Sequence, residues 1–221
     1  MFRKKTDENR EIILQSFYNL EDRLTQKLGA DLVNLAFTAS DSNTNKTMHI
    51  VNIAKHFAED GDRVLVVDAN LRKSELPSVT DYDNERGFID ILLGDYDFES
   101  VIVKDRSYKD LSYIYTGKVS DYADKFLEAS DIRAFYQNAR DRFDYVLIDL
   151  TPNVGIAEAN MFAANADASV VFTNNNLSNS SITRDSIKEL EKSGANVLGL
   201  IITDYEYEED ELDDLFGGYD E

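Results

Sequence analysis

A strand, a polar loop and a Lys-Thr pair at a helix start constrain this chain more than any other stretch. Residues 32–39 are mostly apolar, 40–45 are polar, and Lys46 and Thr47 begin a segment with apolar residues at helical spacing. The N–H groups at a helix N-terminus attract anions, an ammonium adds positive charge, and a hydroxyl can ligate Mg²⁺. The stretch therefore predicts an anion site between a strand and a helix.

This order of elements is the layout of a phosphate-binding P-loop, but the loop contains no glycine. Asn43 and Asn45 stand where the backbone approaches a phosphate and often needs a positive φ. Among residues with a Cβ, Asn tolerates that region best, at a cost on the order of 1 kcal/mol per position. The alternative is a polar loop that only caps a helix. The candidate nucleotide-binding residues here are Ser42, Asn43, Thr44, Asn45, Lys46 and Thr47.

Charge and cysteine content narrow the classes of function. The formal net charge of -20 argues against binding nucleic acid or anionic lipid through the bulk surface. Partners are therefore expected to be basic, small or recognised by a local patch. The lack of cysteine excludes disulfides and thiolate metal sites and fits a cytoplasmic location. We see no apolar run of membrane-spanning length and no signal peptide.

Apolar runs alternate with helical patterns along the rest of the chain. Two continuous runs, 64–68 and 145–149, end in Asp68 and Asp149 and are typical of parallel strands buried on both faces. Further strands are expected at 111–116, 169–173 and 197–203, helices at 87–93, 130–143, 157–166 and 182–193, and a polar loop at 73–86. This alternation predicts an α/β fold with a doubly wound, mainly parallel sheet and helices on both faces. Such sheets bind ligands at the carboxyl ends of their strands, where both acids stand.

The two ends of the chain differ from the middle. Residues 11–28 read as an amphipathic helix, so we place an N-terminal segment at 1–30 and a single domain at 31–204. Residues 205–221 are acidic and too poor in apolar groups to order themselves, which predicts a disordered tail. Three tyrosines, Tyr205, Tyr207 and Tyr219, are interleaved with its acids.

Over nearly its full length, the chain resembles the cytoplasmic tyrosine kinases of bacteria, of the capsule and exopolysaccharide type. The matching segments are Val64–Arg72, similar to the second Walker motif, Phe143–Asp149, similar to Walker B, Gly87–Gly94, Gly194–Gly199 and the tyrosine-bearing C-terminus. The resemblance implies a P-loop fold that binds ATP and Mg²⁺, and control of polysaccharide assembly. It also implies a transmembrane activator of the polysaccharide co-polymerase type, which would hold the chain at the inner face of the membrane.

The resemblance also implies roles for single residues. Lys46 would hold the β and γ phosphates, Thr47 would ligate Mg²⁺, and Asp149 would hold a metal-bound water. Asp68 would orient the metal or act as base toward tyrosine. The further candidates that it implies are Arg72 in catalysis, Thr203 at the adenine-reading position, and Tyr205, Tyr207 and Tyr219 as phosphate acceptors on neighbouring subunits.

The departures from the family pattern fall at positions that, in the family, contact the nucleotide or a neighbouring subunit. The loop glycines are Asn43 and Asn45, the second acid of the Asp-x-Asp motif is Asn70, and Thr203 replaces an Asn. The motif that joins subunits into a ring, Glu-x-x-Arg-x-x-Arg, is degenerate at 15–21, which leaves homo-oligomer formation open. Losing a ligand charge while crowding the phosphate site would cost roughly several kcal/mol of nucleotide binding or transition-state stabilisation.

Three functions stay open on the sequence. The first is an active or weakened tyrosine kinase, and the second is a pseudokinase that regulates polysaccharide assembly as a binding module. The third is a partitioning or septum-positioning ATPase on the same fold. It is disfavoured because Asp41 stands where those proteins carry a signature Lys, and because a net charge of -20 suits neither DNA nor anionic membrane.

Overall fold

The computed structural model describes residues 33–82, 85–119 and 127–205. Contacts divide the chain into two units, Met1–Asp31 with Asp204–Glu221, and Leu32–Thr203. The second unit holds nearly all of the described residues and is the one treated below. The predicted helix at 11–28 and most of the predicted tail lie outside the described residues, so the segment boundaries given above stay predictions.

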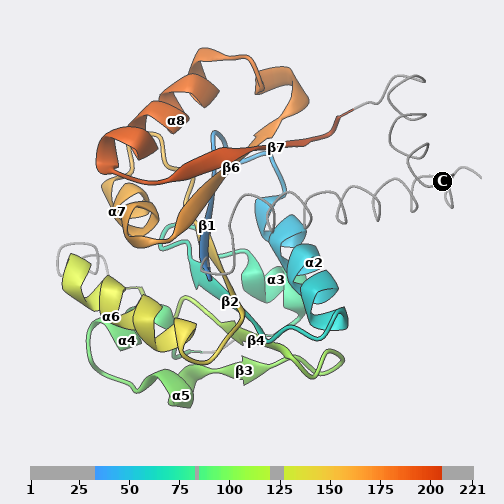
Figure 1. Ribbon diagram of the computed structural model, residues 1–221, viewed down its shortest axis with the longest axis vertical. Helices are drawn as coiled ribbons and strands as arrows, with labels where there is room; N and C mark the ends of the chain where they lie inside the picture. Colours follow the sequence, from blue (N-terminus) through green and yellow to red (C-terminus); the bar gives the residue numbers. More distant parts are fainter. Residues whose placement is uncertain (1–32, 83–84, 120–126, 206–221) are drawn as a thin grey trace, which may run out of the picture. The chain divides into compact units, whose positions relative to one another are not determined.

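The described residues form a seven-stranded sheet with the order β3-β4-β2-β5-β1-β6-β7 (Figure 1). The strands are β1 (Asn34–Ala39), β2 (Val64–Ala69), β3 (Val103–Lys104), β4 (Leu111–Ile114), β5 (Tyr145–Leu150), β6 (Ala168–Asn174) and β7 (Val197–Thr203). All pairs are parallel except β3 with β4. The predicted doubly wound, mainly parallel sheet is confirmed.

Helices cover both faces of this sheet. They are α2 (Lys46–Glu59), α3 (Leu76–Thr80), α4 (Phe88–Leu92), α5 (Phe98–Val101), α6 (Ala129–Arg140), α7 (Ala157–Asn165) and α8 (Ser181–Ser193). Figure 1 shows α2 and α3 on one side of the strands and α6, α7 and α8 on the other. In the part of the chain that the structure describes, no helix has the length and apolar character needed to cross a membrane.

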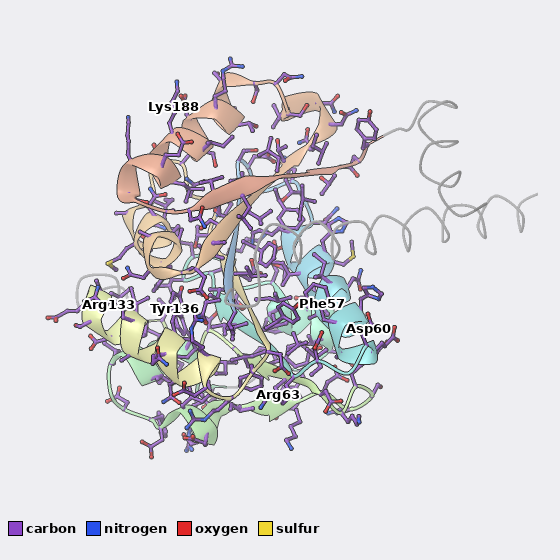
Figure 2. The ribbon with its side chains drawn as sticks, viewed as in Figure 1. Phe57, Asp60, Arg63, Arg133, Tyr136 and Lys188 are labelled. Atoms are coloured by element: carbon purple, nitrogen blue, oxygen red, sulfur yellow. The ribbon has the colours of Figure 1, made fainter. Side chains whose placement is uncertain are left out.

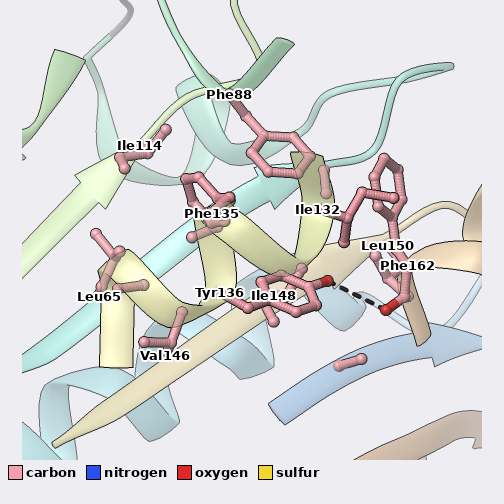
Figure 3. Packing of buried hydrophobic residues seen from close by; sticks show 14 of the residues in the cluster. Leu65, Phe88, Ile114, Ile132, Phe135, Tyr136, Val146, Ile148, Leu150 and Phe162 are labelled. Carbon is pink, nitrogen blue, oxygen red and sulfur yellow. Dashed lines mark hydrogen bonds between the residues drawn. The ribbon is translucent and has the colours of Figure 1, made fainter. Parts of the chain in front are cut away.

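The core is packed with aromatic rings between the sheet and the helices. Phe88 of α4 contacts Phe135 of α6 and Phe162 of α7, with ring centroids 4.8 and 5.3 Å apart (Figure 3). The buried Tyr136 hydroxyl donates a hydrogen bond of 3.2 Å to the Phe162 carbonyl, so its polar atom is satisfied. On the opposite face, Phe57 of α2 lies against β5 (Figure 2). Both faces therefore bury apolar surface, as the continuous apolar strands require.

The structure differs from the sequence-based prediction around the short elements. The segment 73–86, predicted as a polar loop, contains the helix α3, and neither α5 nor β3 was predicted. Elements of two to five residues are too short to show an apolar period, which is why the pattern misses them. Pro77 lies in the first turn of α3, where its missing N–H costs nothing.

Candidate nucleotide site at the carboxyl ends of the strands

The sheet brings the two strand-end acids together beside the start of α2. Strands β2 and β5 pair so that Asp68 lies opposite Asp149, and Phe37 of β1 is the neighbour of Asp149 on the other side. Helix α2 begins at Lys46, directly after the loop that follows β1. Lys46, Thr47, Asp68 and Asp149 are all buried. Residues up to 103 positions apart thus meet at one edge of the sheet. This is the edge, at the carboxyl ends of the strands, where open α/β folds bind their ligands.

The loop keeps a glycine-like backbone without glycine. Asn45, the residue before α2, has φ 49° and ψ 30°, in the left-handed region, and its side chain makes no capping hydrogen bond. Asn43 does not have a positive φ, and its N–H instead donates to Asp41 Oδ1 at 2.7 Å. Both Asn side chains are exposed. The loop therefore needs an unusual conformation only at Asn45, and neither Asn side chain is buried in the site.

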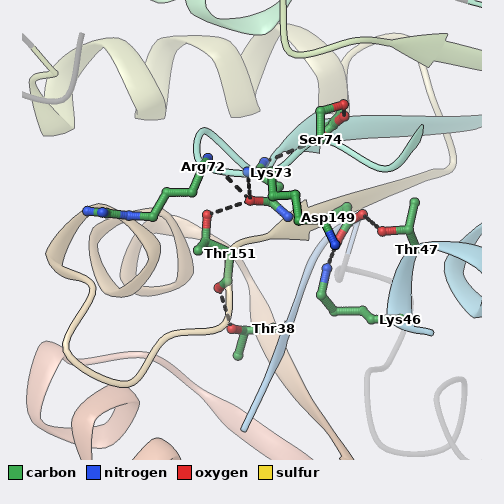
Figure 4. A network of polar contacts seen from close by, with 10 residues as sticks. Thr38, Lys46, Thr47, Arg72, Lys73, Ser74, Asp149 and Thr151 are labelled. Atoms are coloured by element: carbon green, nitrogen blue, oxygen red, sulfur yellow. Dashed lines mark hydrogen bonds and ion pairs between the residues drawn. The ribbon is translucent and has the colours of Figure 1, made fainter. Parts of the chain in front are cut away.

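Asp149 is contacted by both residues of the Lys-Thr pair. Lys46 Nζ forms an ion pair with Asp149 Oδ1, and Thr47 Oγ1 donates to Asp149 Oδ2 at 2.5 Å (Figure 4). Burial lowers the pKa of the Lys46 ammonium to about 7, against the attraction of Asp68 and Glu75. Burial therefore disfavours the charged form of Lys46, and a further anion at the site would favour it.

Asp68 is enclosed by the loop after its own strand. One carboxylate oxygen accepts from the Ser74 hydroxyl, and the other accepts from the Asn70 N–H at 3.1 Å. Burial raises the pKa of the Asp68 carboxyl, although these hydrogen bonds and the charge of Lys46 act against the rise. A carboxyl whose pKa is raised is suited to accept a proton. Ser74 was not predicted from the sequence. Nothing in the predicted polar loop indicated that the hydroxyl of this serine would contact the carboxylate of Asp68, six residues earlier.

Asn70, which replaces an acid, organises the turn after β2. Its side-chain oxygen accepts from the N–H groups of Arg72 and Lys73 at 3.3 and 3.1 Å and from Thr151 Oγ1 at 2.9 Å. Thr38 Oγ1 in turn donates to the Thr151 carbonyl at 2.8 Å. With three donors already on it, this oxygen is occupied as a structural acceptor. Thr151 and Thr38 had no sequence signal, since their role appears only once β1, β2 and β5 are neighbours.

Two of the predicted site residues do not join this group. The Arg72 guanidinium points away from Lys46 and Asp149, and its Nε contacts the buried Glu158 carboxylate of α7 at 2.8 Å (Figure 4). Thr203 ends β7, which β6 separates from β1. It is buried, and its hydroxyl has no hydrogen-bond partner among the described residues.

The remaining candidates lie around or beyond the group. Ser42 is exposed and Thr44 is buried within the loop. Tyr205 is 39% exposed, whereas Tyr207 and Tyr219 lie outside the described residues.

The donor set fits a phosphate-bearing nucleotide and one divalent cation. Mg²⁺ usually takes one or two carboxylates and completes its shell with water and substrate phosphates, so it needs no cage of three acids. Within the described ranges no such cage of three or more His, Cys, Asp or Glu side chains occurs. Lys46, Thr47 and the left-handed turn at Asn45 supply the cation, hydroxyl and backbone shape that a phosphate requires. The chemistry of the site thus matches the layout that the sequence predicted.

Known proteins with similar sequences are bacterial tyrosine kinases. A putative tyrosine-protein kinase EpsB from Ralstonia solanacearum is 28% identical over 176 residues, which are 80% of this chain and 23% of EpsB. The chain thus spans about a quarter of that relative. The tyrosine-protein kinase CpsD from Streptococcus pneumoniae serotype 4 is 26% identical over 190 residues, 85% of this chain and 83% of CpsD. The resemblance to bacterial tyrosine kinases is confirmed.

Solved structures show the same fold. The kinase domain of Escherichia coli tyrosine kinase ETK superimposes with a TM-score of 0.78 at 23% identity, covering 87% of this chain and 78% of that one. The septum site-determining protein MinD with Mg-ADP, from Pyrococcus horikoshii, gives 0.65 at 20% identity, covering 83% and 77%. The AAA domain family matches residues 35–196, which include both strand-end acids and the Lys-Thr pair. Because this match extends over well more than half of its length, the chain belongs to the AAA domain family.

Proposed function

We propose that this chain is a tyrosine-kinase-type protein of capsule or exopolysaccharide biosynthesis that binds Mg-ATP between β1, β2 and β5. The single observation that carries the proposal is the placement of Asp68 opposite Asp149, with Lys46 and Thr47 at the adjoining helix start. A cation, a hydroxyl and two buried carboxylates at one strand edge are what positioning and neutralising a phosphoryl group requires. The sequence similarity to EpsB and CpsD supports the choice of reaction.

In this function each residue has a role that follows from its chemistry. Lys46 would exchange its contact with Asp149 for phosphate oxygens, and Thr47 and Asp149 would hold the cation. Asp68 would take the proton of the acceptor tyrosine hydroxyl, consistent with its raised pKa. When bound, ATP supplies the γ-phosphoryl group and Mg²⁺ neutralises its charge. The proposed acceptors are Tyr205, Tyr207 and Tyr219 on a neighbouring copy of the chain.

Isothermal titration with Mg-ATP tests the binding step. We expect micromolar binding by the wild type and a loss of about 10- to 100-fold in Lys46→Met, since a charge-assisted contact to a phosphate is worth about 1.5–3 kcal/mol. The matched control is Lys188→Met, which replaces an exposed lysine on α8. This variant should bind Mg-ATP as tightly as the wild type does. If the wild type does not bind at millimolar Mg-ATP, kinase activity of this chain is excluded.

Incubation with Mg-ATP, followed by mass spectrometry of the tail, tests the transfer step. Phosphate on Tyr205, Tyr207 or Tyr219 should appear in the wild type and disappear in Lys46→Met. A modification that persists unchanged in Lys46→Met would show that another enzyme, and not this site, supplied it.

A regulatory binding module without catalysis is the second candidate. The observation in its favour is that both Asp68 oxygens already have hydrogen-bond donors and that Asn70, in place of an acid, is used as a structural acceptor. Such a protein would keep the fold and its partner surface without transferring phosphate. Mg-ATP binding without any tail phosphorylation in a purified homo-oligomer would support this function over the first.

A partitioning-type ATPase has the fold in its favour, because MinD shares it, but the loop argues against it. Asp41 stands at the position of the signature Lys, and its carboxylate accepts the Asn43 N–H. A lysine, which has no acceptor, could not make this bond.

The surroundings of the protein are part of the proposal. We propose a cytoplasmic protein at the inner face of the membrane, held there by a transmembrane activator of the polysaccharide co-polymerase type. Co-purification of this chain with a candidate transmembrane co-polymerase tests the partner.

A further inference from the structure

A cavity lies away from the Lys46 group, among α2, α3, β3 and β4. It has a volume of about 260 Å³. Figure 1 shows these four elements grouped at the end of the sheet formed by β3 and β4. Its lining includes three cations, Lys55, Lys104 and Arg106, and four tyrosines, of which Tyr82, Tyr108 and Tyr113 are used below.

The cations of this cavity have no acidic partner in ion-pair contact. Within the described ranges, Lys55, Lys104 and Arg106 form no salt bridge, although the chain carries 43 acids for 23 bases. Asp105 is the one carboxylate among the lining residues, and it is already used. It accepts from the N–H groups of Ser107 and Tyr108 at 2.7 and 3.0 Å and from the Tyr113 hydroxyl at 2.8 Å. Three cations against one carboxylate give the lining residues a net positive charge on an acidic protein, and Lys55 also acts electrostatically on Asp105.

The tyrosines place aromatic faces beside these cations. Lys55 Nζ lies 5.9 Å from the centre of the Tyr108 ring, and Arg106 Cζ lies 5.8 Å from that of Tyr82. Both distances are within reach of a cation–π attraction, which holds the cations at the cavity. Outside the lining, Glu59 of α2 accepts a hydrogen bond from the Tyr108 hydroxyl. The wall thus offers ring surfaces and positive charge together.

The size of the cavity limits what can enter it. Small-molecule sites usually occupy about 300–1,000 Å³, so this cavity suits a single side chain rather than a whole nucleotide. A phosphate alone would contact only the cations, and an aromatic ring alone would contact only the tyrosines, although Lys55 and Arg106 each already lie over a tyrosine ring. A phosphorylated aromatic side chain uses both features.

We propose that this cavity binds a phosphotyrosine side chain presented by a partner protein. Arg106 and Lys55 would contact the phosphate, and Tyr82 and Tyr108 would contact the ring. The inference rests on the proposed function only for the source of phosphotyrosine, because the cavity itself shares no residue with the Lys46 group. It gives this chain a site that recognises the product of tyrosine phosphorylation separately from the site that makes it.

Titration of the full chain with doubly blocked amino acids, followed by NMR, tests the proposal without nucleotide. The probes are N-acetyl amides of phosphotyrosine, tyrosine and phosphoserine, with inorganic phosphate as the fourth. We expect phosphotyrosine to bind about tenfold more tightly than each of the other three, because only it meets both the rings and the cations. Equal binding of the four probes, or no binding of phosphotyrosine, would overturn the proposal.

Two variants locate the binding. Arg106→Gln and Lys55→Gln should each weaken phosphotyrosine binding about tenfold, whereas Lys109→Gln should leave it unchanged. Lys109 is the matched control because it lies on the same turn, is 90% exposed and pairs with Asp110 at 3.4 Å outside the cavity lining. Equal loss in all three variants would indicate general charge attraction and contradict a specific site. Lys46→Met should bind phosphotyrosine normally, so failure of the nucleotide site and failure of this cavity give different results.

Discussion

The left-handed turn at Asn45 yields a sharp prediction about stability. Asn45 is exposed and its side chain caps nothing, so replacing it removes no hydrogen bond. What changes is the cost of holding φ at 49°. For a residue with a Cβ this conformation costs roughly 1–2 kcal/mol, and Asn is among the residues that tolerate it best. Asn45→Ala should therefore lower the free energy of unfolding by about 1 kcal/mol, or the melting temperature by about 2–4 °C for a chain of this size.

Two further variants separate the backbone effect from the loss of an amide. Asn45→Gly should unfold within about 0.5 kcal/mol of the wild type, because relief of the left-handed strain is offset by the greater freedom of glycine in the unfolded chain. Asn43→Ala, in the same loop but without a positive φ, should also stay within about 0.5 kcal/mol.

Urea denaturation followed by circular dichroism measures all three variants. Only Asn45→Ala should shift the midpoint appreciably. If Asn45→Ala were as stable as the wild type, or if Asn43→Ala lost as much, the strain assigned to this turn would be wrong. If Asn45→Gly were the least stable of the three, the greater freedom of glycine in the unfolded chain would outweigh the relief of strain, and the strain would be smaller than assigned.

Three more predictions follow from the site and the core. Burial lowers the pKa of Lys46 to about 7, so a polyphosphate that restores its charge should bind at pH 8 with uptake of up to one proton. The observed binding heats should therefore differ between two buffers of different ionisation heat, and equal heats would contradict this proton uptake. Gly87→Ala places a Cβ 1.9 Å from the Tyr115 carbonyl oxygen and should cost about 2–4 kcal/mol in urea unfolding. Gly94→Ala should cost less, because the space there is open and only the φ of 78° disfavours a Cβ. Arg72→Met should destabilise the chain by about 1–3 kcal/mol, because the buried Glu158 carboxylate loses its partner, while equal stability of the two proteins would refute that pairing.

Much of the frame was predictable because it is encoded in neighbouring residues. Apolar periodicity placed β2, β5 and the helices α6 and α8 within a few residues of their observed bounds, and acids at two strand ends indicated a ligand edge. The Lys-Thr pair could be recognised because a helix start after a polar loop is a local pattern. The resemblance to tyrosine kinases likewise rested on contiguous segments.

The details of the site depended on contacts across the chain. Asn70 accepts from Thr151 only because β2 and β5 lie side by side with residues 81 positions apart in register. Ser74 reaches Asp68, six residues earlier, through the conformation of the turn after β2. The motif at Val64–Arg72 likewise could not show that the Arg72 side chain would contact Glu158 of α7.

The sequence by itself determined the alternation of strands and helices, the lysine and hydroxyl at the start of α2, and the acidic character of the chain. Tertiary structure decided which strands are neighbours, that Asp149 receives both Lys46 and Thr47, and that a positive, tyrosine-lined cavity forms beside β3 and β4. The physical reason is that periodicity and capping depend on residues a few positions apart, whereas strand order and cavity walls are set by the packing of distant segments.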